Sequence, residues 1–251
     1  MKHTLIAFAS VAALVAGLGA ASAQPGPQAV PPMAMSAKAP ASKFLGPDEL
    51  RPEEFLPPPP ADGSPAARTE IAELHRIQAA RTPEAMARAL HDDEVENVTA
   101  FAEVMGPGFQ LEKLPATAVL FKDLRSEDSV AAKRAKAFFQ RTRPWAADPA
   151  LHGCPHGDDA VKSSYPSGHA TMGYAAAGVL ARLDPPKAQA VLARAADYAE
   201  NRLVCAAHYR RDIGAGQTLG AVLVVKLMEK PAFRAEFDAA QAELKAAHIA
   251  D

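Results

Sequence analysis

The sequence predicts an all-α protein, organised as a single-domain helical bundle. Beyond Ala66, apolar residues recur at helical spacing in segment after segment, alanine is abundant, and the alternating pattern of strands is almost absent. Hydrophobic residues make up 49% of the chain, and its length suits one domain with a sizeable core. No internal repeat is visible.

The first residues resemble a secretory signal peptide. Lys2 precedes an apolar run over residues 5–20, and small residues lead up to Ala23. A positive start, a short apolar run and a small-residue cleavage point are typical of such a signal. A retained N-terminal anchor is the alternative, but the run is short for a membrane span. We expect residues 1–23 to be removed and the mature chain to be periplasmic.

The charge of the chain is close to neutral. The formal net charge is −2, and loss of Lys2 with the signal would change it to −3. This balance argues against a general nucleic-acid binder. No segment after residue 23 has the length of uninterrupted apolar sequence that a membrane helix needs, so no membrane partner is expected.

The two cysteines are Cys154 and Cys205. In an exported protein a pair of cysteines suggests one disulfide, although either could be a free buried thiol. His152, Cys154 and His156 alternate closely, but their spacing does not match the usual zinc patterns. We predict a Cys154–Cys205 disulfide and no metal site.

Residues 24–65 form a proline-rich, extended N-terminal segment in this interpretation. The stretch 24–60 contains 11 of the 22 prolines. Residues 24–43 are expected to be disordered or extended. Phe44-Leu45 and Phe55-Leu56 are apolar anchors, and the four prolines 57–60 should form a polyproline II rod lying across the folded body.

Residues 66–251 are expected to form the helical domain, with turn signals separating its helices. Thr82 and Pro83 make a helix start, with Thr as the cap and Pro at the first position. The Gly-Pro-Gly stretch 106–108 is a loop, and Pro144 is expected to end a helix. The expected helical ranges are 66–81, 83–105 with a break near 92–93, a segment opened by Pro115, 126–143, 168–183, 185–202, 211–228 and 231–247. Residues 145–164 are expected to form a long irregular loop.

The stretch from Tyr165 to Thr171 is the centre of the functional prediction. Ser167 can cap a helix, Gly168 allows close approach of the backbone, and His169 stands at the edge of the turn. The small-residue run that follows, 172–180, indicates a buried helix. Because a helix N-terminus directs N–H groups and positive dipole toward one point, the turn is a natural anion site. By itself it could equally be a capped helix with a solvated histidine.

Basic residues precede this turn. Lys136 and Arg143 are seven residues apart, which on one helix would place them on the same face near its C-terminal end. A solvated basic face is the alternative interpretation. The charges expected to face solvent are Lys133, Arg134 and Arg141.

A second group of polar residues follows the turn and consists of Arg202, His208 and Asp212. The spacing of four between His208 and Asp212 would stack them on one helical turn, so that the carboxylate accepts from Nδ1–H of the imidazole. Nε2 then keeps its lone pair, as a nucleophilic histidine requires. The alternative is a surface histidine with an acidic neighbour.

Together these groups suit phosphoryl transfer. The cations would hold nonbridging oxygens, His208 would attack phosphorus, and His169 would protonate the leaving oxygen. No metal or other cofactor is required by this scheme.

The three blocks resemble those of a known superfamily. They read Lys136-x6-Arg143-Pro144, then Pro166-Ser167-Gly168-His169, then Arg202-x5-His208-x3-Asp212. This signature is similar to that of the type-2 phosphatidic acid phosphatase and vanadium haloperoxidase superfamily. The signal peptide, the run from Phe55 into four prolines and the Val204-Cys205 pair resemble the secreted class A bacterial non-specific acid phosphatases in particular.

The resemblance implies a helical bundle of the acid phosphatase and vanadium haloperoxidase type. It also implies metal-independent hydrolysis of phosphate monoesters at acid pH through a phosphohistidine intermediate. The implied nucleophile is His208, its orienter is Asp212, and the acid/base is His169. The implied phosphate-binding residues are Lys136, Arg143, Arg202, and the backbone at Ser167 and Gly168.

Some questions stay open at this stage. The family usually has Ser where this chain has Asn201, which puts one local contact in doubt. A vanadate-dependent haloperoxidase and a lipid phosphatase are the alternative functions. The expected partners are small phosphomonoester substrates, and a homo-oligomer is compatible with the family but is not decided by the sequence.

Overall fold

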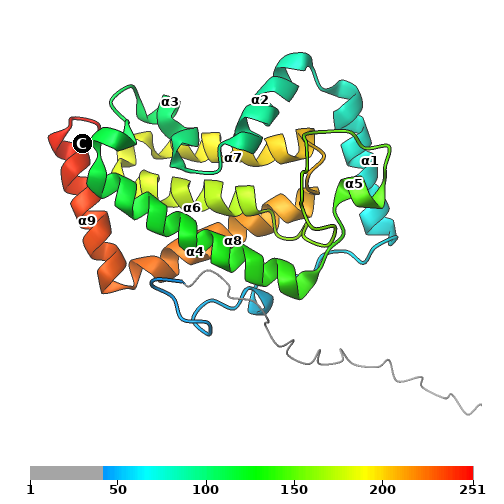
Figure 1. The fold of residues 1–251 in the computed structure, drawn as a ribbon, viewed down its shortest axis with the longest axis horizontal. Helices are drawn as coiled ribbons and strands as arrows, with labels where there is room; N and C mark the ends of the chain where they lie inside the picture. The colour runs from blue at the N-terminus through cyan, green and yellow to red at the C-terminus, as the bar shows by residue number, and fades with distance from the viewer. Residues whose placement is uncertain (1–41, 251) are drawn as a thin grey trace, which may run out of the picture. The chain divides into compact units, whose positions relative to one another are not determined.

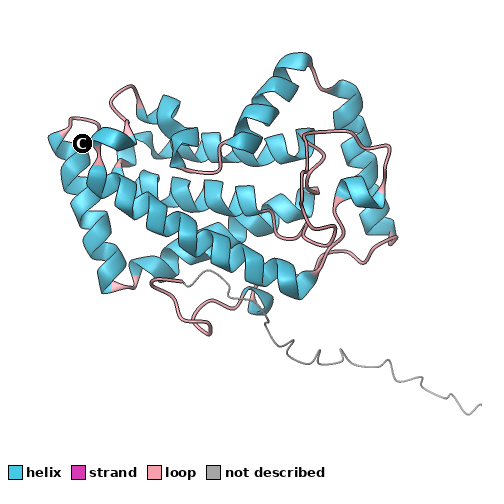
Figure 2. Ribbon diagram, viewed as in Figure 1, coloured by secondary structure: helices cyan, strands magenta, loops and turns pink. Residues whose placement is uncertain are grey.

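The computed structural model describes residues 42–250, and the predicted signal peptide and most of the extended segment before Lys43 lie outside this range. Within it every regular element is helical and no strand occurs, which confirms the all-α prediction (Figures 1 and 2). The α-helices are α1 (Pro65–Ala80), α2 (Pro83–Glu94), α3 (Ala102–Met105), α4 (Pro115–Phe139), α5 (Pro144–Ala147), α6 (Gly168–Leu183), α7 (Ala188–Val204), α8 (Arg210–Met228) and α9 (Pro231–Ala246). The short 3-10 helices are η1 (Pro52–Glu54), η2 (Val98–Phe101), η3 (Leu111–Lys113) and η4 (Pro185–Lys187).

None of the helices in the described range has the length and apolar character needed to cross a lipid bilayer.

Helix α6 is the central helix of the bundle. It packs against α4, α7 and α8, and the three successive alanines 175–177 are all buried (Figure 1). A helix that is apolar on every side has to be covered on every side. The predicted buried helix after Ser167 is therefore confirmed, and its position places its N-terminus among three neighbouring helices.

Two glycines of α8 allow this helix to approach α6 closely. A Cβ at Gly216 would lie 2.7 Å from the carbonyl oxygen of Ser167, and one at Gly220 would lie 2.6 Å from that of Thr171. No side chain fits at these distances. The glycines thus bring the backbone of α8 directly against the first turns of α6, where the Ser-Gly-His stretch begins.

The part of the N-terminal segment within the described range packs on the helices. Leu45, Leu50 and Leu56 are buried in the main core. The Glu127 carboxylate on α4 accepts hydrogen bonds from the backbone N–H groups of Lys43 and Phe44, and the Tyr165 hydroxyl donates to the Pro57 carbonyl at 2.6 Å. These contacts anchor the segment beside α4 and beside the residue that leads into Pro166.

The prediction for residues 115–144 was wrong in one important respect. A single helix, α4, spans 115–139, and it ends because Gln140 adopts the left-handed conformation with φ 45° and ψ 42°. Pro144 does not end a helix but begins α5, and Arg143 before it is extended with ψ 149°, as expected for a residue that precedes proline. Lys136 and Arg143 therefore do not share a helix face.

The remaining helix boundaries lie close to those expected. Side chains of Ser64, Thr82 and Ser167 cap α1, α2 and α6 by accepting a backbone N–H, so the proposed cap at Thr82 is confirmed. The helix break expected near 92–93 occurs slightly later, where α2 ends at Glu94. The short helices η2 and α3 then continue as far as Met105.

Substitution of Gly220 by Ala should destabilise the protein, because the new methyl group would contact the backbone of α6 at Thr171. We expect a loss of about 1–3 kcal/mol in the free energy of unfolding, the usual cost of overpacking. Thermal and denaturant unfolding of the purified variant measure it.

Gly214→Ala is the matched control in the same helix, because a Cβ there meets no atom within 4 Å. It should be neutral or stabilise by up to about 1 kcal/mol through the higher helix propensity of alanine. Equal stabilities of the two variants would contradict the close contact between α6 and α8.

Candidate active site

The residues of the three sequence blocks converge on one place in the bundle. Lys136, Arg143, Arg202 and His169 all act on the charge of His208, and a Cβ at Gly168 would lie 3.8 Å from Lys136 Nζ. The convergence is formed by the end of α4, the N-terminus of α6, the end of α7 and the chain just before α8. The spatial arrangement that the phosphoryl-transfer prediction required is thus present.

His208 is buried, with 1% of its side chain exposed. Its Nε2 lies 2.9 Å from Arg143 Nη1, and its Nδ1 lies 3.4 Å from Asp212 Oδ2. Because a guanidinium can only donate, Nε2 must be the nitrogen with the lone pair, and the proton belongs on Nδ1 beside the carboxylate. Burial, followed by Arg143, lowers the pKa of His208 well below its ordinary value, which keeps the ring neutral.

His208 and Asp212 lie next to each other, but not for the reason expected. The predicted hydrogen bond is absent, because Nδ1 of His208 is buried without a hydrogen-bond partner among the described residues. Helix α8 begins at Arg210, so His208 lies before the helix and Asp212 in its first turn. Asp212 Oδ2 accepts from the backbone N–H of Tyr209 at 2.9 Å, which is the bond of an acidic residue that reaches back over a helix N-terminus. The bend of the chain before α8, rather than a helical turn, brings the imidazole to the carboxylate.

Asp212 is completely buried and has several further partners. Oδ2 accepts from the Ser164 hydroxyl at 2.6 Å, and Oδ1 accepts from Arg141 Nη1 at 2.5 Å. Burial raises the pKa of Asp212 to about 6, and Arg141 opposes this increase. The carboxylate is therefore held in one orientation, with one edge toward His208.

Arg141 was expected to face solvent, and this prediction was wrong. Its guanidinium is buried between Asp212 and Glu70, whose Oε2 accepts at 2.5 Å, and it lies 3.9 Å from the centroid of the Tyr209 ring. The partners are 71 residues away in either direction along the chain. The end of α4 at Phe139 turns Arg141 inward, which no helical spacing could indicate.

Lys136 and Arg143 reach the site from different elements. Lys136 extends from the last turn of α4, and burial, followed by the charge of Arg143, lowers its pKa to about 8. Arg143 is buried, donates to the Ala207 carbonyl at 2.9 Å and pairs with Asp159 at 3.0 Å. Both side chains therefore present positive charge next to His208 at acid and neutral pH.

The N-terminus of α6 supplies the backbone donors. The Ser167 hydroxyl accepts from the N–H of Ala170, while the N–H of Ser167 itself donates to the Asp212 carbonyl at 3.0 Å. The expectation that the Ser167 amide is free for phosphate is therefore not met. Gly168 and His169, as the first residues of the helix, keep N–H groups without an intrahelical acceptor.

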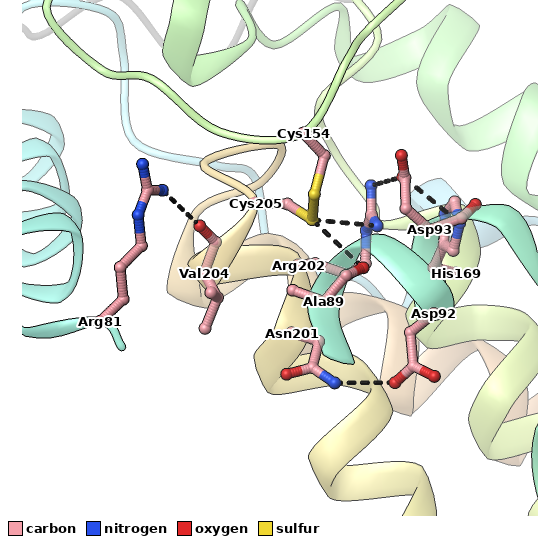
Figure 3. The surroundings of a disulfide bond; sticks show 10 residues. All are labelled: Arg81, Ala89, Asp92, Asp93, Cys154, His169, Asn201, Arg202, Val204 and Cys205. Atoms are coloured by element: carbon pink, nitrogen blue, oxygen red, sulfur yellow. Dashed lines mark hydrogen bonds and ion pairs between the residues drawn. A yellow bond between two sulfur atoms is a disulfide. The ribbon is translucent and has the colours of Figure 1, made fainter. Parts of the chain in front are cut away.

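Arg202 completes the set of cations from the end of α7. Its Nη2 pairs with Asp93 Oδ1 at 2.6 Å, and Figure 3 shows its guanidinium beside Cys205 and Asp93. The preceding residue, Asn201, donates from Nδ2 to Asp92 at 2.7 Å. Consecutive residues of α7 thus bind consecutive residues of α2, and Asn201 has a definite contact in place of the doubtful one.

His169 faces the same acidic segment. Its Nε2 lies 3.2 Å from the backbone carbonyl oxygen of Asp93 and 3.1 Å from Glu96 Oε1. Burial, followed by Arg202, lowers the pKa of His169 well below its ordinary value. Because the Asp93 carbonyl can only accept and the Glu96 carboxylate lies beside it, the proton belongs on Nε2, and Nδ1 is the nitrogen available for exchange.

The predicted disulfide Cys154–Cys205 is present. It joins the irregular loop before Ser164 to the residue after α7, and the N–H of Cys154 also donates to the Cys205 carbonyl at 3.1 Å. The bond fixes the loop that carries Asp159 against the chain that leads to His208.

Several residues of the site were not predicted from the sequence. They are Glu70, Asp93, Glu96, Arg141, Asp159 and Ser164. The pair at 92–93 stood out only as a helix break, and Ser164 only as context of the Ser-Gly-His turn. Among the described residues no group of three or more His, Cys, Asp or Glu side chains is placed to hold a metal ion.

The arrangement can bind one tetrahedral anion. Three cations and a helix N-terminus surround a neutral imidazole whose Nε2 lone pair accepts from one of those cations, Arg143, and a second imidazole has an exchangeable nitrogen. These are the elements of charge stabilisation, nucleophilic attack and proton transfer.

Comparison with known proteins also indicates a phosphatase, in agreement with the geometry of the site. The PAP2 superfamily profile matches residues 118–234. A non-specific acid phosphatase of Salmonella typhimurium is 30% identical over 208 residues, which cover 80% of this chain and 83% of that protein. An acid phosphatase of Zymomonas mobilis is 30% identical over 201 residues, with 77% and 75% covered, and a non-specific acid phosphatase of Providencia stuartii is 27% identical over 199 residues, with 75% and 79% covered.

The chain therefore belongs to the PAP2 superfamily of helical phosphatases. Within it, the chain is a member of the class A bacterial non-specific acid phosphatases and is classed as a phosphoric monoester hydrolase.

Arg141→Met should strongly destabilise the fold. The change leaves the buried carboxylates of Asp212 and Glu70 without their common cation. Removal of one partner from a buried ion pair costs about 3–5 kcal/mol, and unfolding by urea measures the loss.

Lys133→Met is the control, because Lys133 lies on α4 and is exposed. Its effect should stay within about 0.5 kcal/mol, as for other surface substitutions. Similar unfolding midpoints for the two variants would mean that Arg141 does not stabilise the buried carboxylates.

Proposed function

We propose that the protein is a secreted acid phosphatase that hydrolyses small phosphate monoesters through a phosphohistidine intermediate and without a metal ion. The observation that carries the proposal is the state of His208, a buried neutral imidazole with Nε2 toward Arg143 and Nδ1 toward Asp212. A histidine held this way is prepared for attack on phosphorus.

Phosphate binding is assigned to the cations and to the first turn of α6. Lys136, Arg143 and Arg202 neutralise the nonbridging oxygens, and the N–H groups of Gly168 and His169 donate to them. The arginines pair with Asp159 and Asp93 in the structure. The substrate oxygens therefore add to the partners of these guanidinium groups or replace them.

In the first chemical step Arg143 Nη1 donates to a phosphate oxygen instead of to His208 Nε2, and the released lone pair of Nε2 attacks phosphorus in line with the leaving oxygen. A P–N bond forms as the P–O bond breaks, and the proton on His169 Nδ1 of the imidazolium form passes to the leaving alcohol. Asp212 stabilises the positive charge that develops on the His208 ring, since its carboxylate lies beside Nδ1.

In the second step water attacks the phosphohistidine. His169, now neutral, accepts a proton from that water, the P–N bond breaks, and inorganic phosphate leaves with His208 neutral again. The same imidazole thus acts first as acid and then as base. The positive charge needed at phosphorus comes from the three cations, which is the basis for proposing a metal-independent reaction.

Export to the periplasm is part of the proposal. It is supported by the sequence of residues 1–23 and by the disulfide, a bond that persists in oxidising compartments.

His208→Ala tests the mechanism, with release of p-nitrophenol from its phosphate as the assay. Because the substitution removes the nucleophile but none of the cations, kcat should fall by at least about 10³-fold. The exposed His152 provides the control, and His152→Ala should keep the wild-type rate.

Two further measurements test the covalent intermediate and the metal independence. With labelled substrate, alkali-stable and acid-labile phosphate should appear on wild-type protein and not on His208→Ala. Dialysis against EDTA should leave kcat unchanged. Turnover that survives His208→Ala would reject the covalent mechanism, and loss of activity in EDTA would reject its metal independence.

The lowered pKa of Lys136 gives a prediction for substrate binding. Lys136 is cationic below its pKa of about 8 and loses its charge as the pH rises through that value. The KM for an aryl phosphate should therefore increase above about pH 8, by up to tenfold per pH unit if the charge is essential.

Lys136→Arg should move this increase to higher pH, because a guanidinium stays protonated throughout the range. KM is measured from pH 6 to 10 for both proteins. An unchanged KM profile in the variant would show that another group titrates.

A further inference from the structure

Arg125, Glu96 and Asp128 form a cluster on the Nε2 side of His169, and the mechanism above does not use it. Its centre is Arg125 on α4, whose Nε donates to the Glu96 carbonyl at 2.9 Å and whose Nη2 pairs with Glu96 Oε2 at 2.5 Å. The third nitrogen, Nη1, pairs with Asp128 Oδ1 at 2.5 Å. One guanidinium thus joins two carboxylates and one backbone carbonyl group.

Asp128 anchors this cluster to the core. Its side chain is 2% exposed and lies one helical turn after Arg125 on the same helix. Burial raises the pKa of Asp128 to about 8, while Arg125 acts in the opposite direction. Since the planar guanidinium has a fixed geometry, a partner buried on one side determines where its other nitrogens point.

Those nitrogens hold Glu96 against His169. Glu96 Oε2 is occupied by Arg125, and Oε1 lies 3.1 Å from His169 Nε2. The backbone carbonyl oxygen of Asp93 accepts from the same ring nitrogen at 3.2 Å. The Nε2–H group of the imidazole therefore has one hydrogen-bond acceptor, the Asp93 carbonyl, and a carboxylate oxygen of Glu96 beside it as an ion-pair partner.

We propose that Glu96, held by Arg125 over the buried Asp128, is a positioning residue that orients His169 and favours its protonated form. The inference rests on the proposed function, because it requires His169 to act as acid and base. With Nε2–H bonded to the Asp93 carbonyl and the Glu96 carboxylate beside it, Nδ1 is the ring nitrogen left for the phosphate site.

The charges around His169 explain why such a residue matters. The cations that face it are Arg202 on α7 and Lys136 and Arg125 on α4, and the ring of Tyr198 on α7 lies 5.8 Å away. His208 also lies near enough to interact with it. The groups that favour the imidazolium are Asp93 in the last turn of α2 and Glu96 just after that helix.

The sign of the effect follows from this balance. Burial and the cations favour neutral His169, whereas the reaction needs the protonated ring to release the leaving group. A carboxylate 3.1 Å from Nε2 stabilises the imidazolium and so raises the pKa of His169 relative to the same site without it. Loss of Glu96 should lower the pH at which kcat declines.

Glu96→Gln is the test, because glutamine keeps the size and the acceptor oxygen but not the charge. The side chain of Glu96 is 45% exposed, so the variant should fold. We expect the alkaline limb of the kcat–pH profile to move to lower pH by about one unit, from the interaction of charges about 3 Å apart in a solvated setting. KM at acid and neutral pH should change little, since no hydrogen bond or ion pair joins Glu96 to Lys136, Arg143 or Arg202 in the described residues. Glu96 does raise the pKa of Lys136, so a change in KM is expected only at alkaline pH.

Glu103→Gln is the matched control, since it removes one exposed carboxylate from the neighbouring helix α3. Its profile should coincide with that of the wild type. Arg125→Lys keeps a positive charge but loses the fork, so it should shift the limb in the same direction as Glu96→Gln and by a smaller amount.

Two results for Glu96→Gln would overturn the proposal. In one, kcat declines at the same alkaline pH as in the wild type; in the other, kcat is lower by the same factor at every pH. The first would mean no coupling to His169, and the second a merely structural role. His169→Ala separates this from failure of the proposed function. If that variant keeps the full wild-type kcat, the assignment of His169 itself is wrong, whatever Glu96 does.

Discussion

The buried carboxylate of Asp212 is the constraint on which the site depends. One oxygen accepts from Ser164 and from the N–H of Tyr209 and faces His208, and the other binds Arg141. Its backbone carbonyl accepts from Ser167 and so ties the start of α8 to the start of α6. The residue that orients the proposed nucleophile therefore also sets the position of the turn that would hold the anion.

A buried site for an anion must keep its cations charged before the anion arrives. Arg143 and Arg202 are both buried, and each has a carboxylate partner, Asp159 and Asp93 respectively. Such pairs offset the cost of removing the guanidinium groups from water. The partners are more exposed than the arginines, which leaves them able to move aside.

The helical fold and most of the site composition could be predicted from the sequence. Caps, prolines and apolar spacing located α1, α2, α6, α8 and α9 to within a few residues. The blocks around Lys136, Ser167 and His208 identified the residues that converge. The path of the chain between them could not be predicted, because a spacing of seven looks helical whether or not the helix continues. The left-handed conformation of Gln140 ends α4 before Arg143, so Arg143 does not lie on the same helix as Lys136.

By itself the sequence determined the helical class, the order of the helices, the family and the residues of the proposed chemistry, since these follow from local periodicity and from short blocks of fixed spacing. Only the tertiary structure decided that Arg141 is buried, that Asp93 and Glu96 face His169, and that Asp159 lies on Arg143. Contacts such as that of Arg141 with Asp212 join residues 71 positions apart. Their strength depends on burial and on distance in space, and neither leaves a periodic trace along the chain.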